Sequence, residues 1–326
     1  MLSRIAESLY WMSRNLERAD DTARILDINV RHMLEADEGA TEEMQWRPLL
    51  TIVDADEPYL ERHPDGQVTV QRVIRFLTQG PDYPSSLYNS LRLARENARV
   101  VRDRISQEMW EAINEFWLAT DRHLQAKLQP WRAAEFYAYV HREVALFFGL
   151  SQSTMMRGEA YGFTALGSLQ ERADMTARIL DVRYHLLLPD LTLVGSPLDY
   201  YQWGALLKSL SGFEAYRRKY HAGIRPIDVV EFVLLDPAYP RSLRYCLDGM
   251  ERALARIGYL PDGAVPARMQ ALREHLADVS PRGVLEQGLH EYLERFLTLL
   301  ADLTGALQND YFEAHMADAA DAGVEA

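Results

Sequence analysis

The chain of 326 residues contains a single cysteine, Cys246. One cysteine excludes an internal disulfide and a metal cluster held by thiolates alone. Positive charge is also scarce, because 35 Lys and Arg residues face 48 Asp and Glu residues, and the formal net charge is −13. A chain this acidic repels phosphate backbones and anionic membrane surfaces. Neither nucleic acid nor a membrane is therefore expected as a partner.

Long hydrophobic runs are missing as well. No stretch approaches the roughly 18 uncharged apolar residues that a membrane helix needs. The apolar run at residues 9–12 is short and has charges on both sides, unlike the core of a signal peptide. We therefore expect a cytoplasmic protein, and a single cysteine fits a reducing compartment.

The sequence also lacks the usual signatures of bound cofactors and metals. Gly158, Gly162 and Gly167 fall within a helical pattern and do not follow a strand, so they do not form a phosphate-binding loop. Neither a Glu-x-x-His pair nor a His-Glu-x-x-His motif is present. We expect no cofactor, no metal and no ATP bound by this chain alone.

The histidines and the cysteine are therefore given structural roles. His141, His290 and His315 each lie near a glutamate without ligand spacing, and a surface position is expected for each. Cys246 lies inside a predicted helix, where a buried, inert thiol is expected rather than a nucleophile.

The most informative feature that is present is an internal repeat. Residues 17–27 read ERADDTARILD and residues 171–181 read ERADMTARILD, with ten of eleven positions identical. A second block, PDYPSSL at 81–87, returns as PAYPRSL at 237–243. The chain is therefore interpreted as two copies of one fold, residues 1–157 and residues 158–326, each close to the roughly 150 residues of a typical domain.

The repeated elements are predicted to be helices. Apolar residues recur in steps of three and four along residues 3–36, and the pattern returns before Pro189 in the second copy. The other periodic segments are 67–78, 86–129, 132–156, 226–235, 241–258 and 282–316. Residues 54–66 are polar with two prolines and are predicted to be a loop, and 68–70 give the only weak strand signal. The fold class predicted is all-α, a helical bundle whose two copies pack into one body.

Two details refine this bundle. Ser85 or Ser86, and Ser242, are expected to cap the helices that follow the Tyr-Pro blocks. Tyr83 and Tyr239 sit at these turns and are expected to staple the loop to the bundle, although exposed turn tyrosines also serve interfaces.

Charged residues on the repeated helix are the candidate functional groups. One arc of the first copy carries Glu17, Asp20, Asp21 and Arg24, and the arc of the second copy carries Glu171, Asp174 and Arg178. Asp20 with Arg24, and Asp174 with Arg178, are spaced for i,i+4 ion pairs. Arg18 and Arg172 point about 100° away from the adjacent glutamates, so each must find a partner elsewhere.

Two interpretations of these charges stay open. If the two copies pack around a pseudo-two-fold axis, Glu17 faces Arg172 or another arginine of the second copy, and Glu171 makes the symmetric contact. That arrangement is a structural ion-pair network. Alternatively, the same groups line a cleft in which arginine clamps a carboxylate, a phosphate or a peptide terminus.

The same residues carry a family resemblance. The segment Tyr10-Trp11-Met12-x-Arg14-x-Leu16-Glu17-Arg18-Ala19, its echo at 170–181 and the approach at 154–157 resemble the bacterial alpha-E family, a predicted helical domain named for its Glu-Arg motif. The resemblance spans essentially the whole chain and adds Tyr10 and Arg14 to the candidates. The second copy has Ser168-Leu169-Gln170 where the first has Arg14-Asn15-Leu16, which leaves the equivalence of the two sites open.

The resemblance implies a biological setting. Members of the family typically occur beside circularly permuted ATP-grasp ligases, transglutaminase-like proteins and Ntn-hydrolase-type peptidases. The resemblance therefore implies a role in a peptide or amide synthesis-modification system. Because the sequence has no ATP, metal or nucleophile signature, an accessory, non-catalytic component is favoured, which binds a partner ligase, a transglutaminase-like protein or a peptide through the Glu-Arg face. An enzyme that uses Glu17 or Glu171 as a general acid or base in amide or acyl chemistry is the alternative. A purely structural ion-pair network is the third interpretation.

Overall fold

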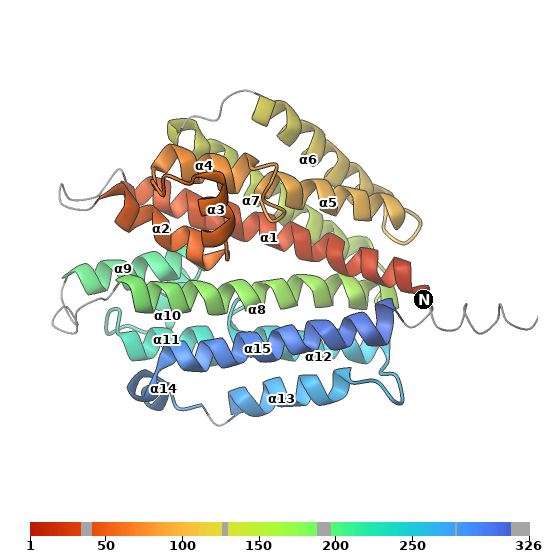
Figure 1. Ribbon diagram of the computed structural model, residues 1–326. Coiled ribbons are helices and arrows are strands. Elements are labelled where there is room, and N and C mark those ends of the chain that lie inside the picture. The colour runs from red at the N-terminus through yellow and green to blue at the C-terminus, as the bar shows by residue number, and fades with distance from the viewer. Residues whose placement is uncertain (34–40, 126–129, 188–196, 278, 314–326) are drawn as a thin grey trace, which may run out of the picture.

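The structure is a computed structural model that describes residues 1–33, 41–125, 130–187, 197–277 and 279–313 (Figure 1). These residues form fifteen α-helices and one π-helical turn, and no strand occurs among them, as the all-α prediction requires. The first seven helices are α1 (Ser3–Met33), α2 (Glu42–Ile52), α3 (Asp56–Arg62), α4 (Val70–Gln79), α5 (Leu87–Val100), α6 (Gln107–Gln125) and α7 (Pro130–Thr154). The others are α8 (Glu159–Leu187), α9 (Pro197–Ser209), α10 (Phe213–Lys219), α11 (Pro226–Leu235), α12 (Leu243–Ile257), α13 (Val265–Ala277), α14 (Pro281–Gln287), α15 (Leu289–Leu307) and the turn η2 (Gln308–Phe312).

The two longest helices, α1 and α8, lie side by side at the centre of the molecule (Figure 1). α1 packs against α5 and α7, and α8 packs in the same way against α12 and α15. The second helix of each half also contacts the long helix of the other half, since α2 contacts α8 and α9 contacts α1. The division into copies 1–157 and 158–326, whose boundary falls between α7 and α8, stays a prediction from the sequence.

Small residues allow α1 and α8 to approach closely. Ala19 and Ala23 of α1 and Ala173 and Ala177 of α8 are fully buried. At Gly167 of α8, a Cβ atom would lie 2.2 Å from the backbone oxygen of Tyr10. A side chain at this glycine would therefore push the two helices apart.

The Tyr-Pro turns behave as expected. Ser86 Oγ accepts a hydrogen bond from the backbone N–H of Asn89, and Ser242 Oγ accepts one from that of Tyr245, so each serine caps its helix. Both turn tyrosines are buried staples. The Tyr83 hydroxyl donates to the Val53 carbonyl at 2.6 Å, and the Tyr239 hydroxyl donates to the Leu210 carbonyl at 2.5 Å.

Each half holds a matching set of stacked aromatic rings beside this turn. In the first half, the Tyr59 ring stacks on His63 and the Phe76 ring stacks on Tyr83. In the second half, the corresponding stacks are Tyr216 on Tyr220 and Phe232 on Tyr239. The first tyrosine of each set also donates a hydrogen bond from its hydroxyl group to a backbone oxygen of the following loop. Tyr59 donates to the Gln67 carbonyl, and Tyr216 donates to the Gly223 carbonyl.

The predicted elements need four corrections. The stretch predicted at 282–316 is broken at Gly288 into α14 and α15, and residues 314–316 of it lie outside the described residues. The segment predicted as a loop at 54–66 contains α3, because Pro58 lies in its first turn, where a proline has no hydrogen bond to break. The stretch 86–129 is broken into α5 and α6, and Ser106 begins the second helix by accepting from the N–H of Met109. Residues 68–70 form no strand, because Thr69 caps α4.

No helix in the described part of the chain is both long enough and apolar enough to span a bilayer.

Candidate functional site

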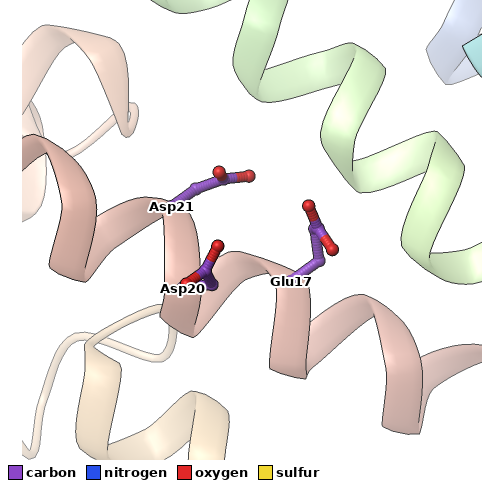
Figure 2. A group of neighbouring side chains, drawn as sticks. All are labelled: Glu17, Asp20 and Asp21. Carbon is purple, nitrogen blue, oxygen red and sulfur yellow. The ribbon is translucent and has the colours of Figure 1, made fainter. Parts of the chain in front are cut away.

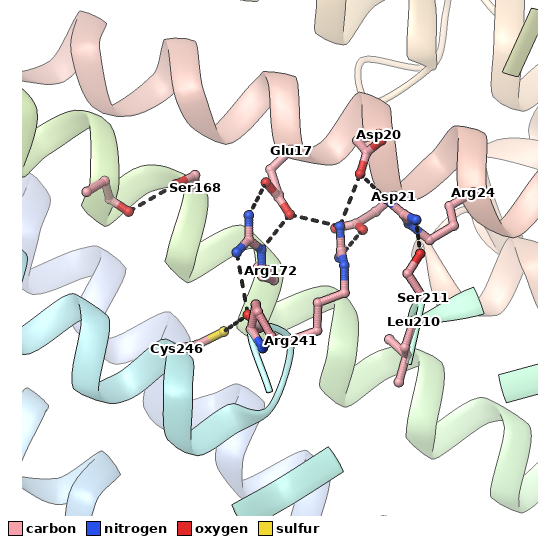
Figure 3. A network of polar contacts seen from close by, with 12 residues as sticks. Glu17, Asp20, Asp21, Arg24, Ser168, Arg172, Leu210, Ser211, Arg241 and Cys246 are labelled. Carbon is pink, nitrogen blue, oxygen red and sulfur yellow. Dashed lines mark hydrogen bonds and ion pairs between the residues drawn. The ribbon is translucent and has the colours of Figure 1, made fainter. Parts of the chain in front are cut away.

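The contact between α1 and α8 brings the two Glu-Arg motifs together. Figure 3 shows the pair that Glu17 of α1 forms with Arg172 of α8. Arg172 of α8 donates from Nε and Nη2 to the two oxygens of Glu17, at 2.7 and 2.9 Å. Arg18 of α1 donates from the same two atoms to the oxygens of Glu171, at 2.5 and 3.0 Å. Both glutamates are 1% exposed. The motifs therefore form two reciprocal, bidentate ion pairs inside the protein.

Glu171 is bound by a second arginine, which lies on α1 like Arg18. Arg14 lies one turn before Arg18 on α1, and its Nε donates to Glu171 Oε2 at 2.7 Å. Burial alone would raise the pKa of the Glu171 carboxyl, but the guanidinium groups of Arg18 and Arg14 outweigh it and hold the pKa at about 2. Glu171 is therefore a permanently charged carboxylate at neutral pH.

A chain of hydrogen bonds fixes Arg14 in place. Its Nη1 donates to the Tyr10 hydroxyl, which donates in turn to Gln170 Oε1, each at 2.9 Å. The Gln170 amide donates onward to Thr304 Oγ1 of α15 at 2.6 Å. Burial raises the pKa of the Tyr10 hydroxyl, so it stays protonated and can serve as this bridge.

Glu17 takes its second arginine from a distant part of the chain. Arg241, in the turn before α12, lies 3.2 Å from Glu17 through its Nη2. The same guanidinium group donates to Asp20 at 3.1 Å and to Asp21 at 2.6 Å. Arg241 occupies the position at which the first half has Ser85 in the repeated turn. One arginine thus serves three carboxylates of α1.

Asp20 is held by three cationic or donor groups. Arg24 pairs with Asp20 along α1 and also donates to Ser211 Oγ. His141 of α7 places Nδ1 2.5 Å from the other Asp20 oxygen. Burial opposes ionisation, but Arg24, the hydrogen bond from His141 and Arg241 together hold the pKa of Asp20 well below its usual range.

Asp21 is the least compensated acid of the group. It is fully buried, and its Oδ2 has no hydrogen-bond partner among the described residues. Burial raises the pKa of the Asp21 carboxyl to about 7, with Glu17 and Asp20 adding to the effect of burial and Arg241 opposing it. Met175 occupies the matching position of the second copy.

Glu17, Asp20 and Asp21 are also the group that could chelate a cation, since each offers an oxygen within 4.8 Å of the others (Figure 2). Their oxygens already accept from Arg172, Arg241 and Arg24. A divalent ion would have to displace these guanidinium groups, so the donor set suits arginine better than a metal.

The structure brings eight of the ten candidate residues together in two neighbouring groups. The Glu171 group includes Arg14, Arg18 and Tyr10, and the Glu17 group includes Arg172 with Asp20 and Arg24. The remaining predicted pair, Asp174 with Arg178, forms an i,i+4 bridge on α8 with a 2.7 Å contact. Sequence reasoning missed Arg241, for which the only available signal was the change from Ser85 to arginine in the repeated turn.

The surface role expected for His141 is wrong. His141 is half-buried and belongs to the Glu17 group through Asp20. His290 lies 2.7 Å from Asp181 through Nδ1 and is also half-buried, and His315 lies outside the described residues. The burial expected for Cys246 is confirmed, and this burial raises the pKa of its thiol to about 12.

This geometry limits the chemistry open to the two glutamates. Both oxygens of Glu17 and both of Glu171 accept hydrogen bonds from arginine. The parts of the motif nearest to solvent are the side chains of Arg18 and Arg172, which are 23% and 20% exposed. A molecule that approaches from outside therefore meets guanidinium groups before it meets a carboxylate.

The chain is similar to three uncharacterised mycobacterial proteins, one from Mycobacterium bovis and two from strains of Mycobacterium tuberculosis. Each is 24% identical over 330 residues, which cover 93% of this chain and 36% of the relative. The chain thus spans about a third of the length of these curated relatives. No solved structure matches it. A family model described as a predicted α-helical domain with a conserved ER motif matches residues 1–312, and the chain belongs to this family, Alpha-E.

Proposed function

We propose that this chain is a non-catalytic, accessory component of a bacterial peptide or amide synthesis-modification system. In this proposal the Glu-Arg motif fastens α1 to α8 and fixes the surface that a partner recognises. One observation carries the proposal: both oxygens of each motif glutamate are bound by arginine at the helix contact. In this proposal the Glu-Arg motif is a structural ion-pair network, which was the third interpretation of the sequence, and the protein that contains it is an accessory component.

The same observation argues against an enzyme that uses Glu17 or Glu171. A general acid or base must reach the proton that it transfers, and both carboxylates are buried. An acid or base also needs a pKa near the working pH, whereas two arginines hold the pKa of Glu171 at about 2.

An accessory role is supported by the setting that the family resemblance implies and by the greater length of the relatives. The resemblance implies a circularly permuted ATP-grasp ligase or a transglutaminase-like protein as the partner, or a peptide as the ligand. The mycobacterial relatives carry further sequence beyond the matched region, so in those proteins the domain has covalent neighbours. A partner at the Glu-Arg face would contact the exposed edges of Arg18 and Arg172, and acidic groups would be complementary to them.

The test is affinity purification of the tagged protein from its native host, followed by quantitative mass spectrometry. Glu17→Gln and Glu171→Gln are purified in parallel, and circular dichroism at the same temperature checks that each variant is folded. Glu43→Gln is the matched control, because Glu43 is exposed and its one ion pair within the described part of the chain is with Arg47 of its own helix.

We expect a ligase or a transglutaminase-like protein to be retained by the wild type and by the control. Capture should fall in the motif variants only to the extent that they unfold, because the substituted glutamates are buried and support the face without contacting the partner themselves. Loss of capture from variants with the wild-type melting temperature would show that the glutamates themselves take part in binding and would contradict this supporting role. Amide-forming or amide-cleaving activity of the isolated wild type, abolished in folded Glu171→Gln, would overturn the accessory role.

A further inference from the structure

A cavity of about 680 Å³ lies far from the Glu-Arg network, beside α4, α5 and α6. α4 and α6 each pack against α5, and the amide of Gln79 bridges the ends of the two outer helices by donating to the Leu124 carbonyl at 2.8 Å. The volume is in the range of pockets that hold small ligands. Its polar lining includes Arg62, His63, Arg72, Arg75, Tyr88 and Asp121.

Two arginines of α4 offer unused donors to this cavity. Arg75 makes no hydrogen bond or ion pair with any described residue and is exposed. In contacts with described residues, Arg72 uses only Nη1, which donates to both oxygens of Asp65 and to the Gln67 carbonyl. Its Nε and Nη2 atoms remain, so Arg72 and Arg75 together can bind a carboxylate through several charge-assisted hydrogen bonds.

The remaining lining groups supply a rigid edge and one opposite charge. The Nδ1 atom of His63 lies 3.2 Å from the Tyr59 carbonyl, and the ring stacks on Tyr59 at 4.4 Å, which fixes the imidazole in place. Asp121 of α6 accepts from the Tyr88 hydroxyl at 3.1 Å. A ligand with both a carboxylate and an N–H donor therefore fits the lining better than an anion that has acceptors alone.

The second half of the chain shows that the same local fold forms without arginine at the positions of Arg72 and Arg75. α11 corresponds to α4 in the spacing of the repeated block, and it carries Asp228 and Glu231 where α4 carries Arg72 and Arg75. The aromatic stacks beside both helices are the same. Because the same framework stands with acids in one half and arginines in the other, the arginines of α4 are available for a ligand.

We propose that this cavity binds a short acidic peptide, whose carboxylates pair with Arg72 and Arg75 and whose N–H groups face Asp121. The proposal stands on the cavity and its lining, and it does not depend on the accessory role proposed above. It assigns a ligand class to a part of the molecule outside the Glu-Arg motif.

The test is isothermal titration calorimetry at low ionic strength with triglutamate as the probe. Triglutamine of the same length and inorganic phosphate are the comparison ligands. The variants are Arg75→Gln and Arg72→Gln, and Arg252→Gln is the matched control. Arg252 is exposed on α12, in the other half of the molecule, and the substitution removes the same charge.

We expect triglutamate to bind the wild type and the control alike, and we expect each cavity variant to weaken binding about tenfold, the loss typical of a charged hydrogen bond. Triglutamine should bind at least tenfold more weakly than triglutamate. Absence of triglutamate binding would overturn the proposal, and so would an equal loss in Arg252→Gln, which would indicate non-specific charge attraction. Phosphate binding that matches or exceeds triglutamate binding would replace the acidic peptide with a phosphate ligand.

Discussion

The Glu17 and Glu171 groups share one ion-pair geometry but differ in everything that surrounds it. Each glutamate takes one bidentate arginine from the opposite helix. Glu171 then takes Arg14 from α1, whereas Glu17 takes Arg241 from the turn before α12. The comparison shows that each motif glutamate has a second guanidinium group, and that the position in the chain that supplies it differs between the two.

The two groups also differ in how charge is distributed. Among the described residues, Glu171 is the one acid that forms an ion pair with Arg14 and Arg18. Glu17 lies beside Asp20 and Asp21, and Arg241 contacts all three acids. Removal of one acid should therefore have unequal consequences in the two groups.

The largest expected effect is that of Glu171→Gln, which keeps the volume and removes the charge. Arg14 and Arg18 would lose their common partner inside the protein, at a cost of about 3–5 kcal/mol in the free energy of unfolding. Glu17→Gln should cost about half as much, because Arg241 keeps Asp20 and Asp21 as partners. Urea unfolding at pH 7 measures both values, and equal losses would show that the neighbouring acids do not compensate.

The next effect concerns the closeness of α1 and α8. Gly167 of α8 and Ser13 of α1 occupy matching positions in the repeat. Gly167→Ala places a Cβ atom against the Tyr10 backbone and should destabilise the protein by about 1–3 kcal/mol. Ser13→Ala removes a hydroxyl group that donates within its own helix and should cost less than about 1 kcal/mol. Thermal unfolding of the two variants would contradict this asymmetry if their melting temperatures fell equally.

The pH dependence of stability should separate the two groups by sign. Glu171 has a lowered pKa, so the stability that it contributes is present above its usual value of 4.5 and is lost as the pH falls toward 2. Asp21 has a raised pKa, so folding favours its protonated form, and stability is lost as the pH rises from about 4 to about 7.

Asp21→Asn should therefore remove this loss of stability at rising pH. Urea unfolding of the wild type and of this variant between pH 4 and 8 is the measurement. Met175→Leu is the control, since the matching position of the second copy has no titrating group. Parallel stability curves for wild type and Asp21→Asn would show that Asp21 is ionised throughout.

The smallest expected difference lies at the two helix caps. Ser86→Ala and Ser242→Ala each remove a cap worth about 1 kcal/mol. Ser242 should cost slightly more, because its hydroxyl group also donates to the Asp236 carbonyl at 2.5 Å. Equal melting temperatures for the two variants would assign the whole effect to the cap itself.

Much of the fold follows from local patterns. The stripes of apolar residues predicted α1 and α8, and the serines of the Tyr-Pro blocks predicted the starts of α5 and α12. α3 was not predicted, because its proline and polar residues are typical of a loop and only burial of Tyr59 favours a helix there. Tertiary packing decides such short helices, and it cannot be deduced from seven residues.

The site was predictable only in part. The repeated Glu-Arg pair allowed a reciprocal contact as one of two interpretations, since each arginine points away from its own glutamate. The contributions of Arg241 and His141 could not be deduced, because they lie 220 and 121 residues along the chain from their acidic partners, Asp21 and Asp20. Their contacts depend on how distant helices pack, and local spacing carries no information about that.

The distance between Asp21 and Arg241 also has a consequence for biosynthesis. A ribosome adds about 5–20 residues per second, so the 220 residues that separate the two partners take roughly 10–45 s to translate. At the start of this interval the acids of α1 have neither Arg172 nor Arg241 within reach. Later Arg172 has been synthesised but Arg241 has not, and until Arg241 follows, water must solvate the acids. The first half of a nascent chain therefore cannot close its charged face when it emerges, and it has to wait for the second half before α1 can be buried.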